Sequence, residues 1–158
     1  MKAASVNEIK KAIQDLDKKE VQDFCLRLAK FKKENKELLT YLLFEAQDEN
    51  TYVESVKQEM DELFPTVPKS NVYLMKKVLR KILRIVNKQI RYSGINESEV
   101  TLRIYFCMKM KKSGFQLKSS AVIFNLYNQQ LKKISAALSK LKEDLQFDYA
   151  RDFEYISK

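Results

Sequence analysis

The sequence has little of the two residues that most often make turns, with two glycines and two prolines among 158 residues. A strand-rich fold needs a turn about every ten residues and usually builds it with glycine or proline. The scarcity of both residues therefore predicts an all-α protein. Apolar residues make up 45% of the chain and charged residues 32%, which is typical of a globular protein. We expect a single helical domain over residues 1–158.

Histidine is absent, and this absence excludes several kinds of chemistry. The most frequent general base and the commonest metal ligand are missing, and neither a Ser-His nor a Cys-His nucleophile pair is possible. Two cysteines, Cys25 and Cys107, are too few for a zinc site or a disulfide framework. Both lie in apolar stretches, so we expect two buried thiols. The sequence predicts no catalytic residue, no metal site and no cofactor.

Long hydrophobic runs are also absent. No apolar stretch approaches the length of about 18 residues that a membrane span needs, and the N-terminus lacks the apolar region of a signal peptide. We therefore expect a protein of the reducing cytoplasm. The net charge of +9 favours weak attraction to nucleic acid or to an anionic membrane, without specifying either.

Cap signals predict where the helices begin. Capping boxes at Ser5–Glu8, Asp17–Glu20 and Thr51–Glu54 predict the starts of the first, second and fourth helices. Asn35 is the expected cap of the third. The stretch "FPTVPKS" contains both prolines and predicts a connector over residues 64–70, between two helical halves.

Both glycines follow a basic stretch, in "RYSG" and "KKSG", which is typical of a helix C-terminus. We expect a fifth helix over residues 71–92 and a sixth from Asn96 to just before Gly114. The sixth is apolar on nearly all sides around 104–108, which predicts the centre of the fold. A seventh begins near Ser119 or Ser120, and the pattern leaves open whether it continues past residue 145 or gives way to an eighth. The expected fold is seven or eight antiparallel helices in a bundle or a short stack of helical hairpins.

The predicted fifth helix has one strongly basic face and no acidic residue. At 100° per residue its seven cations fall within an arc of about 140°. Two tyrosines lie in or beside the arc, where they could stack on a base. The candidate anion-binding residues are Tyr73, Lys76, Lys77, Arg80, Lys81, Arg84, Lys88, Arg91 and Tyr92.

The alternative is that this basic face pairs internally or is only solvated. Residues 45–64 hold seven acids against Lys57 alone, and Asp144, Asp148 and Asp152 form a second acidic stripe. Because the connector is short, we expect the cations from Lys76 to Lys81 to be partly paired. We expect those from Arg84 to Arg91 to be open.

Two pairs of glutamates give a remote enzymatic alternative. Glu34 with Glu37 and Glu59 with Glu62 resemble the paired glutamates that hold magnesium in all-helical nucleoside-triphosphate pyrophosphohydrolases. With 21 acids in the chain, pairs at this spacing are expected by chance.

The stretches "KFKKENKELLTYLLFEA", "VLRKILRIVNKQIRYSG" and "RIYFCMKMK" resemble a family of short, all-helical bacterial proteins of unassigned function. The resemblance covers most of the chain from residue 20 onward and implies a helical domain in bacterial cytoplasm, without a site. We expect a non-enzymatic binding or adaptor module for another macromolecule, protein or nucleic acid. No small-molecule ligand is predicted. The main alternative is a nucleic-acid-binding protein that uses the basic helix.

Overall fold

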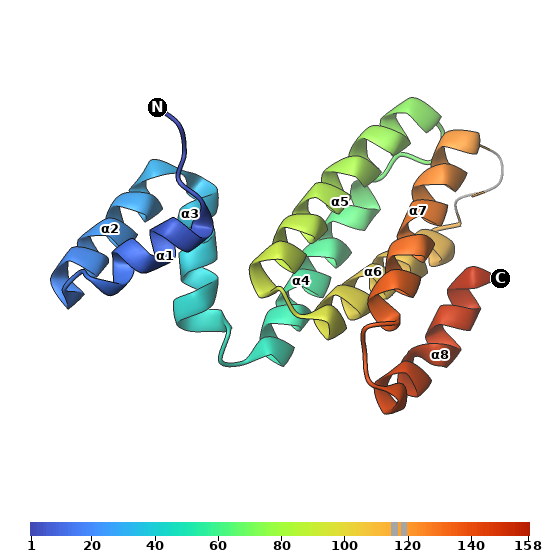
Figure 1. The fold of residues 1–158 in the computed structure, drawn as a ribbon. Helices are drawn as coiled ribbons and strands as arrows, with labels where there is room; N and C mark the ends of the chain where they lie inside the picture. Colours follow the sequence, from blue (N-terminus) through green and yellow to red (C-terminus); the bar gives the residue numbers. More distant parts are fainter. Residues whose placement is uncertain (115–116, 118–119) are drawn as a thin grey trace. The chain divides into compact units, whose positions relative to one another are not determined.

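The computed structural model of the chain describes residues 1–114, 117 and 120–158. These residues form eight α-helices and no strand (Figure 1), which confirms the all-α prediction. They divide into two compact units, Met1–Phe44 and Glu45–Lys158. A single domain over the whole chain stays a prediction. The predicted connector over residues 64–70 lies inside the second unit.

The first unit contains α1 (Val6–Gln14), α2 (Lys18–Phe31) and α3 (Lys33–Thr40). Both predicted capping boxes are present: Ser5 and Glu8 exchange hydrogen bonds at the start of α1, and Asp17 and Glu20 do so at α2. Each pair satisfies amide N–H groups that the first turn of a helix leaves without an intrahelical partner.

The predicted cap of the third helix is wrong. The N-cap of α3 is Lys32, without a side-chain hydrogen bond, and Asn35 lies inside the helix. The Asn35 amide instead donates to the carbonyl of Leu28 at 2.9 Å, which ties α3 to the preceding helix. A π-helical stretch, Tyr41–Glu45, follows α3.

The first unit has almost no interior. None of its three α-helices buries a side chain, and Phe31 on α2 is 75% exposed. A segment of this length rarely encloses a core of its own, because small units bury a small fraction of their surface. The prediction that Cys25 is buried is therefore wrong: its thiol lies on α2 and is exposed.

The second unit consists of α4 (Glu49–Leu63), a 3-10 turn (Phe64–Thr66), α5 (Val72–Ser93), α6 (Asn96–Lys112), α7 (Ala121–Leu138) and α8 (Glu143–Ser157). The fourth helix begins earlier than predicted, because Asp48 caps it by accepting from the Thr51 amide. Asn71 caps α5, and Gly94 ends it with a φ of 66° that glycine adopts without strain.

The predictions for the last two helices are confirmed in part. Ser120 is the N-cap residue of α7, while the alternative start at Ser119 falls outside the described residues. The seventh helix ends at Leu138 and a separate α8 follows, so the chain does form an eighth helix.

Helix α6 lies at the centre of the second unit, as predicted. It packs against α4, α5, α7 and α8, and it buries more side chains than any other described helix. Phe106 is fully buried and its ring lies 5.4 Å from that of Phe64. The α6 surface is thus covered on most sides, and it holds α5 and α7 in fixed positions beside it.

None of the helices in the described part of the chain is both long and apolar enough to cross a membrane.

A candidate anion-binding groove between α5 and α7

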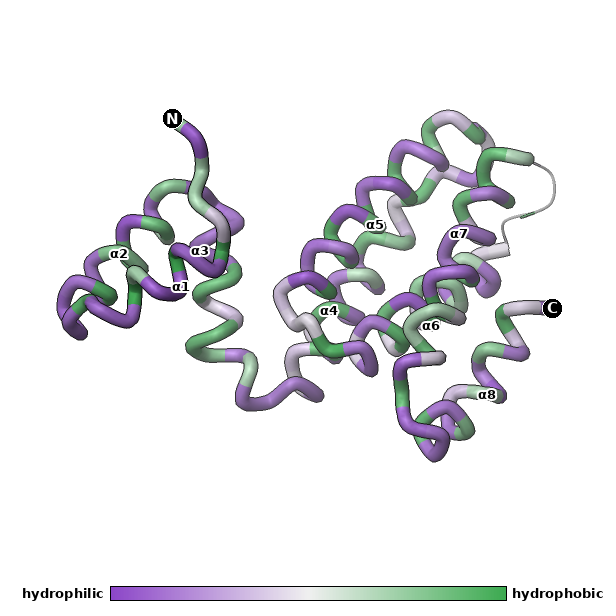
Figure 2. The backbone as a smooth tube through the Cα atoms, viewed as in Figure 1, coloured by the Kyte–Doolittle hydropathy of each residue, from purple (hydrophilic) through white to green (hydrophobic). Residues whose placement is uncertain are grey.

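Helix α5 presents an apolar face to the core and a basic face to solvent. Leu79, Ile82 and Val86 have no exposed surface, whereas Arg80 and Arg84 are exposed. The alternation follows the helical period and is visible along α5 in Figure 2. Five of the seven predicted cations are exposed, and Lys76 and Lys88 are half-buried.

The expected pairing of the N-terminal part of this face is wrong. Within the described residues, none of Lys76, Lys77, Arg80 and Lys81 forms an ion pair with an acid. Arg84 and Arg91 are exposed, as expected, whereas Lys88 is half-buried. The stripe of Asp144, Asp148 and Asp152 on α8 is exposed, and it makes no ion pair with any described cation.

Two acids of α4 interact with other groups instead of these cations. Asp61 forms an ion pair with Lys109 of α6 at 2.8 Å and accepts from the Tyr105 hydroxyl at 2.7 Å. Glu54 pairs with Lys57 within α4. The contact between α4 and α5 includes apolar side chains and the hydrogen bond from the Tyr52 hydroxyl to Gln89 Oε1 at 2.7 Å.

A groove of about 810 Å³ lies between α5 and α7. Five cations and four side-chain amides line it, and its described lining residues include no Asp or Glu. The lining residues are Tyr73, Lys76, Lys77, Arg80, Leu83, Arg84, Asn87, Val122, Asn125, Leu126, Gln129, Gln130 and Lys133. The predicted basic face is thus one wall of a concave site.

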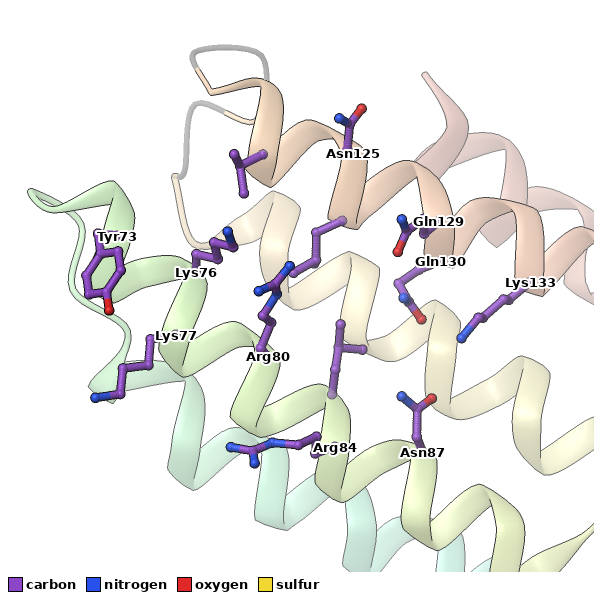
Figure 3. Close-up of a pocket in the computed structure, with 13 residues that line it drawn as sticks. Tyr73, Lys76, Lys77, Arg80, Arg84, Asn87, Asn125, Gln129, Gln130 and Lys133 are labelled. Atoms are coloured by element: carbon purple, nitrogen blue, oxygen red, sulfur yellow. The ribbon is translucent and has the colours of Figure 1, made fainter.

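The two walls carry matching stripes of polar side chains. On α5, polar side chains line the groove at a spacing of four residues: Lys76, Arg80 and Arg84. The same spacing is found on α7, with Asn125, Gln129 and Lys133. Residues four apart lie on one face of a helix. Lys76 and Arg80 reach toward α7 in Figure 3, and Lys133 reaches back toward α5. The α7 wall was not predicted from the sequence, although the spacing of its polar residues could have indicated it.

A buried arginine underlies the groove. Arg103 of α6 is 5% exposed, and its Nη1 donates to Asn87 Oδ1 and to Gln130 Oε1, each at 2.9 Å. Its Nε donates to Glu99 at 2.7 Å, so the buried charge is paired. One residue from each wall is therefore fixed to the helix beneath.

Four of the predicted candidates lie outside the groove lining: Lys81, Lys88, Arg91 and Tyr92. Lys81 and Lys88 stand at the edge of the basic arc that is farther from α7, about 100° or more from Asn87 around the helix axis. Arg91 and Tyr92 lie beyond Asn87, the last lining residue of α5. The groove lining thus contains five of the predicted candidates: Tyr73, Lys76, Lys77, Arg80 and Arg84.

The glutamate pairs do not converge on a metal site in the described residues. Glu34 and Glu37 lie on α3, and Glu59 and Glu62 lie on α4. Within the parts of the chain that the structure describes, no group of three or more His, Cys, Asp or Glu side chains is placed to hold a metal ion.

Comparisons of the chain with protein-family models, with curated proteins and with solved structures find no match. The family resemblance of the sequence therefore stays an expectation, and the groove is the feature from which a function can be inferred.

Proposed function

We propose that the second unit binds nucleic acid through the groove between α5 and α7. The observation that carries the proposal is uncompensated charge: the five lining cations Lys76, Lys77, Arg80, Arg84 and Lys133 form no ion pair with any described acid. Their mutual repulsion costs a few tenths of a kcal/mol for each pair of like charges four residues apart. A phosphate backbone relieves this repulsion and releases its own counterions.

Concentration of the charge in a hollow supports a polyanion as the ligand. Low-dielectric walls focus the field of the lining charges, which raises the local concentration of the anion and its rate of association. The flanking amides and Tyr73 add hydrogen-bonding and stacking groups that suit nucleotides.

The test is the salt dependence of binding to a fluorescent oligonucleotide, measured by anisotropy with the full chain. We expect the logarithm of the affinity to fall linearly with the logarithm of salt concentration. The Lys76→Gln/Arg80→Gln variant should flatten that slope by about 1.4, or about 0.7 for each phosphate of a single strand that the variant no longer neutralises. No binding of the wild-type chain to any DNA or RNA at low salt would disprove the proposal.

A matched control separates the groove from general charge. Lys81→Gln/Arg91→Gln removes one lysine and one arginine from the same helix, at exposed positions outside the groove lining. Its slope should stay close to that of the wild type. An equal flattening of the salt slope in the two variants would mean that net charge alone attracts the ligand.

A second candidate, an adaptor that binds another protein, is favoured by the first unit. Apolar side chains stand exposed along α1 and α2, among them Val6 at 84% and Phe31 at 75%. Exposed apolar groups of this kind are typical of protein-binding surfaces. A partner recovered from nuclease-treated extract by the wild-type chain, and lost by Phe31→Asp, would support this function. Retention of every recovered partner by Phe31→Asp would count against it.

A further inference from the structure

We infer that the ligand of the groove is a single strand, with its phosphates along α5 and its bases against α7. The inference rests on the proposed function and names the substrate class. It is carried by the different chemistry of the two walls. Helix α5 supplies four of the five lining cations, whereas three of the four lining amides, Asn125, Gln129 and Gln130, belong to α7.

Each wall suits a different part of a nucleotide. Phosphates are met by Lys and Arg, and these contacts position a strand without reading its sequence. Side-chain amides have both donors and acceptors, which complement the exposed edges of bases. A strand lying along the groove therefore matches both walls at once when its backbone follows α5.

The concave shape favours a strand over a duplex. A protein that reads a duplex through its major groove inserts a helix or a pair of strands, so its contact surface is convex there. Here Lys76 and Arg80 reach across a hollow toward the facing helix (Figure 3), so a ligand in the groove would lie between the two walls. A volume of about 810 Å³ is within the range of small-ligand sites, which suits a few unpaired nucleotides better than a whole duplex.

Arg103 orients the amides so that they present donors. A guanidinium only donates hydrogen bonds, so the oxygens of Asn87 and Gln130 must face Arg103. Gln130 is 3% exposed, and its amide nitrogen has no hydrogen-bond partner in the described part of the protein. Gln130 lines the groove, so a ligand in the groove could reach this nearly buried amide nitrogen. An acceptor on a base edge would satisfy it.

Tyr73 gives the groove a stacking platform. It is 74% exposed and stands near the start of α5, at one end of the groove (Figure 3). Stacking on an aromatic ring tolerates every base and is available only where bases are unpaired. Tyr73 thus offers a stacking site for one more base of a strand that lies in this orientation.

The test compares three fluorescent ligands of equal length with the full chain: a single strand, the same strand in a duplex, and an abasic strand that keeps the phosphates. We expect the wild type to prefer the base-bearing single strand about tenfold, the scale of one stacked base. Asn125→Ala/Gln129→Ala should lower its affinity toward that of the abasic strand without changing the salt slope. Lys76→Gln/Arg80→Gln should flatten the slope for both strands.

Both α7 positions are exposed, so this variant is expected to fold, and circular dichroism checks that it does. Equal affinity for all three ligands, with loss in the α5 variant, would overturn the single-strand inference and leave the proposed function standing. An α7 variant that binds all three ligands as the wild type does would also overturn it. No loss in the α5 variant would instead contradict the proposed function itself.

Discussion

The side chain of Gln130 accepts a hydrogen bond from Arg103 at 2.9 Å, which joins α7 to α6 beneath the groove. Gln130→Leu removes this acceptor and leaves a buried guanidinium donor without it. We expect the free energy of unfolding to fall by about 1–3 kcal/mol, measured by urea denaturation. The neighbouring Gln129 is exposed and has no hydrogen bond within the described residues, so Gln129→Leu should stay within about 0.5 kcal/mol of the wild type. Similar losses in both variants would contradict this role of Gln130.

The two thiols should differ sharply in reactivity. Cys25 is exposed, whereas burial raises the pKa of Cys107 to about 12 and shields its sulfur. Because the thiolate is the reactive form, a disulfide reagent at neutral pH should label one thiol quickly in the native chain and the second only after unfolding. Cys25→Ser should abolish the fast reaction. Two thiols labelled at one rate in the native protein would contradict the burial of Cys107.

The ion pair between Asp61 and Lys109 predicts a pH-dependent stability. The Lys109 ammonium and the Tyr105 hydroxyl lower the pKa of Asp61 below its usual value. A pKa that is lowered by folding gives stability that is present above the unfolded-state value and is lost as pH falls through the folded-state value. Asp61→Asn should therefore destabilise the protein at neutral pH, by at most about 1 kcal/mol for so exposed a pair.

Thermal unfolding of this variant and the wild type across the acidic range provides the measurement. The difference in stability should shrink as pH falls through the aspartate range. Asp152→Asn serves as the control, because Asp152 is exposed in the middle of α8 and makes no ion pair in the described structure. A difference between Asp61→Asn and the wild type that persisted at low pH would show that the ion pair is not its cause.

The contrast between the two units predicts effects of very different size for two phenylalanine substitutions. Phe106→Ala opens a cavity at the centre of α6 and should cost about 3–5 kcal/mol. Phe31→Ala removes a side chain that is 75% exposed, and it should change stability by less than about 0.5 kcal/mol. Chemical denaturation of the two variants measures both values. A large loss from Phe31→Ala would mean that α2 is covered in solution.

Local signals in the sequence predicted much of the fold. Ser5 and Asp17 cap their helices where expected, because a cap depends on residues close in sequence. The central place of α6 followed from its apolar circumference. The prediction that Cys25 is buried was wrong, because periodicity identifies an apolar face without showing whether another element covers it.

The pairing of the two walls needed information that local patterns do not contain. The basic wall was visible as a stripe on one helix, whereas its partner wall depended on α6 placing α7 beside α5. The predicted ion pairs failed for a similar reason, since the rotation of α4 directs Asp61 toward Lys109. A charge count along the chain does not give that rotation.

Lysine footprinting tests the groove most directly. The full chain is acetylated briefly with and without a single-stranded oligonucleotide, and mass spectrometry gives the modification of each lysine. Lys76, Lys77 and Lys133 should be protected by the strand, while Lys81 on the same helix should stay as reactive as in the free protein. Equal protection of Lys81, or unchanged reactivity of Lys76 and Lys133 in the bound protein, would contradict binding in the groove.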